Sequence, residues 1–455
     1  MGIGGFCMSQ NKNRVDLLNG PIFKGLVVFA LPILFSTVFQ QLYNTVDTMI
    51  VGNTLGDNSL AAIGACTAIY DLMVGFALGI GNGLAIVTAR SYGSKDENLL
   101  KKSVASALVI GVITSLVITV IGQYTLLPLL RVLNTPEAIV MESLSYIKTI
   151  VLFTFVMFMY NLCAGLLRAV GNSLMPLIFL VVSSCLNIGL DYYFITQLNM
   201  GVRGAAVATV ISQGVSVVCC LYYIFKNVKL LVPEKEHFTI DVNLYKEMLG
   251  QGLSMGFMGS IVSAGSVILQ YGINGLGTLV IAGHTAARKI YMFFNMPFIA
   301  MGQAMSTFVS QNKGANQRDR IRQGLRIGYT YDVIMAAIIT GIIFLTAKPL
   351  VQLITGSSEA VVIDNAVMYL KVVGPFYAVL GVLIQSRFAL QGIGAKIVPL
   401  ISSVIELVGK ILFVIIFIPS FQYMAVIFCE PVIWCVMTLQ LLLSLWTHPY
   451  MKGVE

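Results

Sequence analysis

The sequence predicts an all-α integral membrane protein of twelve transmembrane helices, arranged as two six-helix bundles related by a pseudo-twofold axis along the membrane normal. Three observations carry this prediction: an apolar composition, regularly recurring apolar runs, and an internal repeat. Of the 455 residues, 57% are hydrophobic and only 11% are charged, whereas a soluble domain carries about 25% charged residues. Because so few polar groups cannot cover a soluble surface, the excess apolar surface must face lipid.

The apolar runs are each about 20 residues long, enough for a helix to cross about 30 Å of hydrocarbon. A helix is required because lipid offers the backbone no hydrogen-bond partner. We expect transmembrane helices at 24–51, 59–84, 103–126, 144–167, 174–195, 204–225, 250–273, 279–309, 327–347, 365–389, 397–418 and 424–446.

The basic residues predict the orientation. An even number of spans puts both termini on one side, and most of the 28 Lys and Arg lie in loops on that side. Only seven lie in the opposite loops or at span starts, so the positive-inside rule predicts cytoplasmic termini in the cell membrane. The inner group includes Lys12, Arg14, Arg90, Lys95, Lys101, Lys102, Lys226, Lys229, Arg318, Arg320, Arg322 and Arg326.

The two halves of the chain resemble each other at an offset of 221 to 223 residues. Gly56 then meets Gly277, Gly93 meets Gly314, and the segment 166–177 (LLRAVGNSLMPL) meets 389–400 (ALQGIGAKIVPL). Six spans per repeat return the chain to the starting side, which gives both halves the same topology. We therefore expect an N-lobe at 1–225, a cytoplasmic linker at 226–249 and a C-lobe at 250–455. Two such bundles can rock about a central site, which favours a transporter over a channel.

Polar residues within the spans are costly, roughly 2.5–3.5 kcal/mol for an Asp at the helix centre, so each needs a reason. Three of the first six spans carry polar residues at helical spacing, which places them on one face of each helix. These residues are Gln40, Asn44 and Asp47 in the first span, Ser184, Asn187 and Asp191 in the fifth, and Thr209, Gln213 and Ser216 in the sixth.

Asp47, Asp191 and Thr209 all lie in the outer half of their spans, so the three polar faces could meet. Their oxygens suit Na⁺, and they suit a shared proton equally, because two close carboxylates repel each other when both are charged. The alternative is structural: single polar residues often join helices, and an Asp near the interface can face headgroups. The second half lacks the pair, since Ile268 and Val414 stand at the corresponding positions.

Further residues in the spans are candidates for the wall of a substrate cavity. Glu406 and Lys410 are spaced i, i+4, so they either neutralise each other within the bundle or line the cavity. Pro32 removes a backbone hydrogen bond and marks a site where the first span can bend. The cavity candidates are Gln40, Asn44, Asp71, Gln213, Met292, Glu406 and Lys410, although Met in a span mostly faces lipid or other helices.

Several segments resemble the multidrug and toxic compound extrusion (MATE) transporters over nearly the whole chain. Residues 32–62 (PILFSTVFQQLYNTVDTMIVGNTLGDNSLAA) look like that family's first-span signature, and 186–213 (LNIGLDYYFITQLNMGVRGAAVATVISQ) look like its fifth and sixth spans. The inner-loop pieces 90–93 (RSYG) and 168–172 (RAVGN) fit as well. The resemblance implies a two-lobed, twelve-helix fold. It also implies export of amphipathic, often cationic, organic compounds in exchange for Na⁺ or H⁺.

The resemblance also implies which residues bind the coupling cation. In the branch with an N-lobe cation site, ligands come from spans one, four, five and six. The matching positions are Asp47, Asn187, Asp191 and Thr209, with Tyr146 and Asn161 on span four as further members. Other branches use acids on spans seven and ten. Span seven here has no acid and span ten offers Gln385 and Arg387 instead, which favours the N-lobe branch.

Other functional classes fit less well. A flippase for lipid-linked or polysaccharide precursors is the alternative, but such proteins often line the cavity with basic residues, and few stand within these spans. No His/Asp/Ser cluster or metal-ligand spacing suggests an enzyme or a metal site. We expect no cofactor besides the coupling ion. The expected partners are small organic cations or drugs and the bilayer, without nucleic acid or an obligatory protein partner.

Overall fold

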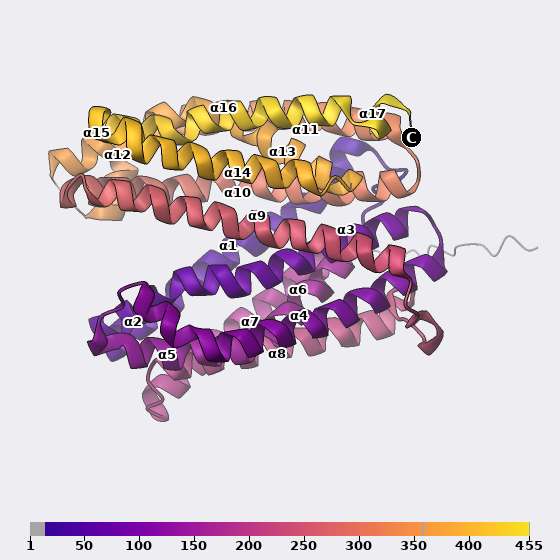
Figure 1. Ribbon diagram of the computed structural model, residues 1–455, viewed down its shortest axis with the longest axis horizontal. Helices are drawn as coiled ribbons and strands as arrows, with labels where there is room; N and C mark the ends of the chain where they lie inside the picture. Colours follow the sequence, from indigo (N-terminus) through magenta and orange to yellow (C-terminus); the bar gives the residue numbers. More distant parts are fainter. Residues whose placement is uncertain (1–13, 357–358, 455) are drawn as a thin grey trace, which may run out of the picture. The chain divides into compact units, whose positions relative to one another are not determined.

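The computed structural model describes residues 14–356 and 359–454, so Lys12 of the predicted inner group lies outside the described residues. The described chain is almost entirely helical (Figure 1). Among these described residues, ten helices are long and apolar enough to cross a membrane, and a bent pair, α5 (Glu137–Leu152) with α6 (Thr154–Ala169), makes an eleventh crossing if it counts as one span. The predicted eighth span is α10 (Thr278–Gly314), which is long enough but carries more polar residues, among them His284 and Arg288.

The first six predicted spans correspond to helices whose ends extend beyond the apolar runs. Two spans contain a π-helical turn, an irregularity that often marks functional positions. The elements are α1 (Ile22–Leu55), α2 (Asp57–Tyr70) with η1 (Asp71–Gly75) and α3 (Phe76–Gly93), α4 (Glu97–Val132), the bent α5–α6 pair, α7 (Leu174–Tyr192) with η2 (Tyr193–Gln197), and α8 (Val202–Asn227).

The connecting segment and the last six spans follow. The connection holds two short 3₁₀ turns, η3 (Lys229–Leu231) and η4 (Lys235–His237). The remaining elements are α9 (Val242–Asn274), α10, α11 (Arg318–Thr355), α12 (Ala360–Val373) with η5 (Gly374–Phe376) and α13 (Tyr377–Ile393), α14 (Ile397–Leu412) with η6 (Phe413–Phe417) and α15 (Ile418–Phe421), α16 (Tyr423–Thr447) and the short α17 (Pro449–Lys452).

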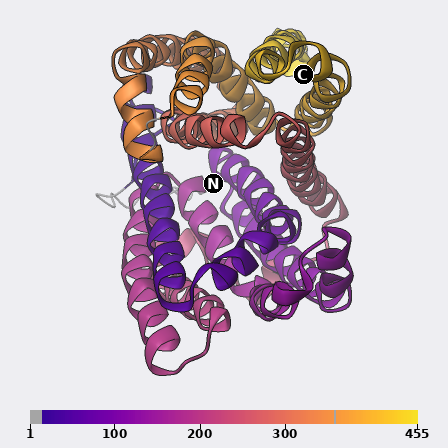
Figure 2. The same cartoon turned by 90° about the vertical axis from the view of Figure 1, so that its left-hand side faces the viewer.

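The chain forms two compact units whose limits cut through three helices. The first unit holds the N-terminal segment up to Gly20, Leu31–Ser260 and Ser310–Asn316; the second holds Pro21–Ala30, Ile261–Val309 and the chain from Gln317 onward. Helix α1 passes from the second unit to the first between Ala30 and Leu31, directly before Pro32. In Figure 2 the C-terminal helices of the second unit, orange to yellow, are seen end-on as a packed group.

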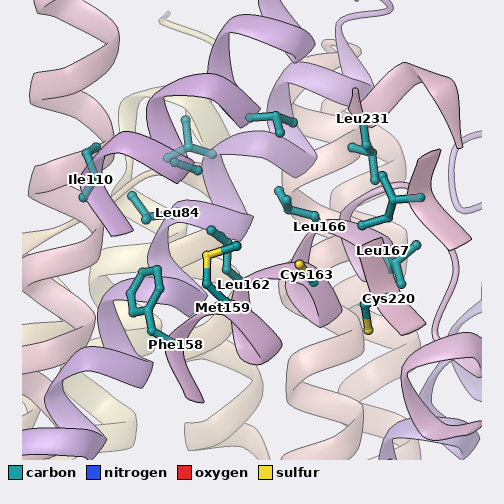
Figure 3. Packing of buried hydrophobic residues seen from close by; sticks show 14 of the residues in the cluster. Leu84, Ile110, Phe158, Met159, Leu162, Cys163, Leu166, Leu167, Cys220 and Leu231 are labelled. Carbon is teal, nitrogen blue, oxygen red and sulfur yellow. The ribbon is translucent and has the colours of Figure 1, made fainter. Parts of the chain in front are cut away.

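The core of the first unit is formed by leucine, isoleucine and sulfur-containing side chains from α3, α4, α6 and α8. Phe158 and Leu162 on α6 are fully buried, and Leu84 of α3 and Cys220 of α8 belong to the same cluster (Figure 3). Since lipid tails are as apolar as these side chains, helix association in a membrane depends on close van der Waals packing. This core holds α8, which carries one of the polar faces, against α3, α4 and α6.

Glycine allows α3 and the first part of α9 to approach closely within the first unit. A Cβ built on Gly83 would lie 2.6 Å from Gly252 Cα, and one built on Gly79 would lie 2.7 Å from Gly256 Cα. Real Cβ atoms do not approach backbone this closely, so any side chain here forces the two helices apart.

We expect Gly83→Ala to destabilise the purified protein by about 1–3 kcal/mol, the usual cost of overpacking a tight contact. Gly259→Ala is the matched control, because it lies on α9 with no atom within 4 Å of its added Cβ and should be neutral or slightly stabilising. Thermal unfolding in detergent measures both. Equal unfolding temperatures for the two variants would contradict the close approach.

Candidate cation-coupling site

Helix α7 presents two polar side chains inside the first unit. Asn187 and Asp191 stand one turn apart on its inner face and are only 2% and 0% exposed. The wider π-helical turn η2 begins at Tyr193, just after Asp191. Polar groups this deep normally have hydrogen-bond partners, yet both oxygens of Asp191 and both amide atoms of Asn187 lack one in the described structure.

Asp47 reaches the same place from α1. Its carboxyl group faces the carboxyl group of Asp191, and its Oδ1 is buried without a hydrogen-bond partner. Val51, one turn further along α1, packs against Ile195 and Ala205, which holds this part of α1 against η2 and α8. The sequence-predicted acids therefore lie side by side rather than pointing separately into lipid.

A small cavity lies beside Tyr43 and Asn187, each one helical turn from Asp47 on α1 and Asp191 on α7. Its volume is about 10 Å³, close to the space that one water molecule needs. The wall is mostly polar and comes from α1, α6, α7 and α8. It is formed by Tyr43, Tyr160, Leu180, Ser183, Ser184, Asn187, Thr209, Ser212 and Gln213.

The arrangement suits a small cation. Two neighbouring buried carboxylates cannot both remain charged at low cost, and either a proton or a bound cation removes the repulsion. The unpaired oxygens of Asp47, Asn187 and Asp191, with Gln213 Oε1 nearby on the cavity wall, offer hard ligands for such an ion. No group of three or more His, Cys, Asp or Glu that could hold a metal ion occurs among the described residues.

The other residues of the predicted site lie at different distances from the acids. Tyr146 on α5 is close to Asp47, and Thr209 and Gln213 lie on the cavity wall. Asn161 instead donates its amide hydrogen to Met157 O of its own helix at 2.9 Å. These positions leave the functional roles of all four residues as predictions.

The predicted substrate-cavity residues are distributed over both units. Gln40, Asn44 and Asp71 are exposed, with Asp71 at the start of the π-helical turn η1. Met292 is 49% exposed on α10. Glu406 and Lys410, by contrast, are buried in the second unit.

Glu406 and Lys410 belong to a buried charge network. Lys410 Nζ lies 2.8 Å from Glu406 Oε1 and 3.9 Å from Glu430 Oε1. Arg288 binds Glu430 at 2.6 Å, and Arg387 lies 3.9 Å from Glu406. The i, i+4 pairing that the sequence predicts is present, and it is extended at both ends by arginines from other helices.

Two polar side chains were missed by the sequence analysis. Tyr43 stands one turn before Asp47 on the same face of α1 and lies near both acids, so the face spacing could have included it. Asp332 on α11 is fully buried, and as a single acid in an apolar span it had no neighbour in the sequence to mark it.

The comparisons with known proteins assign the family. The MatE family model matches residues 32–193 and again residues 255–416. The chain belongs to the MATE family. The two matches are offset by 223 residues, which agrees with the internal repeat. As a member of a transporter family, the chain is a multi-pass membrane transporter and not an enzyme.

The relatives of this MATE transporter include bacterial proteins named for drug resistance. It is 27% identical over 354 residues to "Probable multidrug resistance protein YoeA" of Bacillus subtilis, covering 76% of each chain. It is 24% identical over 400 residues to "Probable multidrug resistance protein NorM" of Thermotoga maritima, covering 85% of this chain and 83% of the relative.

Solved structures show the same fold. The crystal structure of MATE in the bent conformation has a TM-score of 0.88 at 23% identity, covering 97% of this chain and 98% of that one. A MOP superfamily transporter from Pyrococcus furiosus has a TM-score of 0.87 at 24% identity, covering 95% and 97%. The fold with twelve helices is thus shared.

Proposed function

We propose that this MATE transporter is a secondary active multidrug efflux antiporter. It exports amphipathic, often cationic, organic compounds in exchange for Na⁺ or H⁺ by alternating access. The observation that carries the proposal is the pair of facing acids, Asp47 on α1 and Asp191 on α7, whose buried oxygens lack partners. The names of the relatives, which refer to multidrug resistance, support the substrate class.

The proposed mechanism uses the cation to change which arrangement of the acids is stable. A ligand shifts a conformational equilibrium only by its differential affinity for the two states. An empty site leaves two like charges together, whereas a filled site removes the repulsion. Entry of the cation from outside therefore stabilises the packed arrangement of α1 and α7, and its release inside permits the return.

The test is export of ethidium, a fluorescent organic cation, from proteoliposomes that contain the purified protein. Na⁺ and pH gradients are imposed separately, each with the membrane potential clamped. We expect one gradient to drive export and its reversal to drive accumulation. Ethidium movement that follows its own gradient alone, whatever cation gradient is applied, would show that this chain is no cation-coupled antiporter.

A precursor flippase is the alternative, and the buried charge network weighs against it. Lys410, Arg387 and Arg288, the basic residues of the charge network, each pair with Glu406 or Glu430, so none of the three offers an unpaired charge to a phosphate. A flippase assay with a fluorescent lipid-linked pyrophosphate in the same proteoliposomes separates the two functions.

We also propose that the protein lies in the cell membrane and that both of its termini are on the cytoplasmic side.

We expect Pro32→Ala to slow coupled export while leaving ethidium binding intact. Helix α1 runs through Pro32 without interruption, but a proline inside a helix removes one backbone hydrogen bond and permits bending. Restoring that bond should stiffen α1 directly after residues 30 and 31, where the helix leaves the second unit and enters the first. Export rate and equilibrium binding are measured in parallel, with an expected loss of rate of about fivefold or more. Unchanged coupled export would refute a bend at this position.

A further inference from the structure

A further acid lies buried in the second unit, outside the network of ion-paired residues. Asp332 on α11 is 0% exposed, and neither of its oxygens has a hydrogen-bond partner. It takes part in none of the ion pairs among the described residues. Gln385 of α13 faces its carboxyl group. This side chain is also 0% exposed and also lacks partners at both amide atoms.

A glycine on α11 and a glycine on α13 leave space for these two side chains. Gly328 lies one turn before Asp332 on α11, and Gly381 lies one turn before Gln385 on α13. A Cβ on Gly381 would lie 2.7 Å from Asp332 Cβ, and one on Gly328 would lie 3.1 Å from both Nε2 and Oε1 of Gln385. Each polar side chain therefore lies over the other helix's glycine, and a side chain at either glycine would collide with it.

Within the part of the chain that the structure describes, Asp332 has no charged partner that could compensate an ionised carboxylate. The nearby titratable groups are Tyr329 and Tyr331 on α11 itself, and the Tyr329 hydroxyl bonds Ser386 Oγ at 2.8 Å. On the α10 side, the apolar ring of Phe298 lies against Gly381. Arg387, two residues beyond Gln385, is engaged by Ser402 and Glu406. An ionised buried carboxylate without a partner is strongly unfavourable.

We propose that Asp332 is a second proton-binding site of this transporter, located in the second unit and independent of Asp47 and Asp191. The neutral carboxyl group donates its O–H to Gln385 Oε1, which gives each of the two otherwise unpaired side chains a hydrogen-bond partner. A sodium ion fits less well, because only the Asp332 carboxylate and one amide oxygen are available, and the helical carbonyls are already bonded within their helices.

The break before α13 gives the site a way to open. The 3₁₀ turn η5 contains Pro375 and interrupts the span between α12 and α13. Thr340 of α11 donates its hydroxyl to Gly374 O at 2.8 Å, which ties α11 to this break. Movement of α13 about the turn separates Gln385 from Asp332 and lets water reach the carboxyl group, which then releases its proton. This step rests on the proposed antiport function.

Proton counting tests the exchange. Purified protein in weakly buffered detergent solution receives ethidium, and a pH-indicator dye records the protons released per ethidium bound. We expect Asp332→Asn to lower that number by about one relative to the parent. It should also abolish any release that remains in the Asp47→Asn/Asp191→Asn background. Asp364→Asn, an exposed acid in the same unit, is the matched control and should leave the number unchanged.

A spectroscopic measurement keeps the proposal testable if Asp332→Asn folds poorly. The infrared spectrum of the parent at neutral pH should contain a protonated-carboxyl band that shifts to higher frequency in Gln385→Leu, which removes the acceptor. The second site is refuted if Asp332→Asn releases as many protons per ethidium as the parent, or if the infrared band of Gln385→Leu is the same as that of the parent. Either result leaves the antiport proposal standing. The antiport proposal fails separately, when no cation gradient drives ethidium export.

Discussion

Replacing Asp191 by Asn reduces cation-driven ethidium export by about 5- to 150-fold, the range of ordinary coupling free energies between two ligands. The substitution keeps the shape of the side chain but removes its negative charge. The facing Asp47 then no longer has a second carboxylate to repel when the site is empty, so cation binding loses its influence on the packing of α1 against α7. Asp47→Asn should act in the same direction for the same reason.

The measurement is the initial rate of export from proteoliposomes with the driving gradient imposed. Asp57→Asn is the control, because Asp57 lies exposed at the start of α2 in the same unit and should export at the parent rate. Equilibrium binding of ethidium, measured without a gradient, should change much less than the rate. Parent-like export by both Asp47→Asn and Asp191→Asn would remove these acids from the coupling mechanism.

Glu430→Gln destabilises the second unit by about 3–5 kcal/mol, the usual cost of removing one partner from a buried ion pair. Glu430 lies between Arg288 at 2.6 Å and Lys410 at 3.9 Å, and its side chain is 9% exposed. Tyr369 also donates its hydroxyl to Glu430 Oε2 at 3.2 Å. The neutral amide would leave a single acid, Glu406, among three basic side chains, Arg288, Arg387 and Lys410.

Thermal unfolding of the purified variant in detergent measures the loss, with the yield of folded protein as a second readout. Asp319→Asn is the matched control. It also breaks an acid–arginine pair, with Arg322 at 3.3 Å, but the Asp319 side chain is 87% exposed, so the expected cost is about 0–1 kcal/mol. If Glu430→Gln unfolds at the same temperature as Asp319→Asn, the network contributes no more than a surface pair.

Local patterns in the sequence predicted several parts of the candidate site. The spacing of Asn187 and Asp191 placed both on one face of α7, and Glu406 and Lys410 were paired by their i, i+4 spacing, which the 2.8 Å contact reproduces. Such predictions succeed because helical periodicity relates residues only a few positions apart. The same reasoning could not find the Arg288–Glu430 pair, whose members are 142 residues apart in the chain.

The sequence by itself determined that this chain lies in a membrane as an all-helical, internally repeated transporter, because hydrocarbon accepts only apolar segments with internally bonded backbones. Only the tertiary structure decided which buried polar groups meet across helices. Asp332 and Gln385 stand on separate spans, and their contact depends on Gly328 and Gly381 lying opposite them. Hydropathy and helical spacing describe each helix alone, whereas the rotation and register of one helix against another follow from side-chain packing along the whole interface.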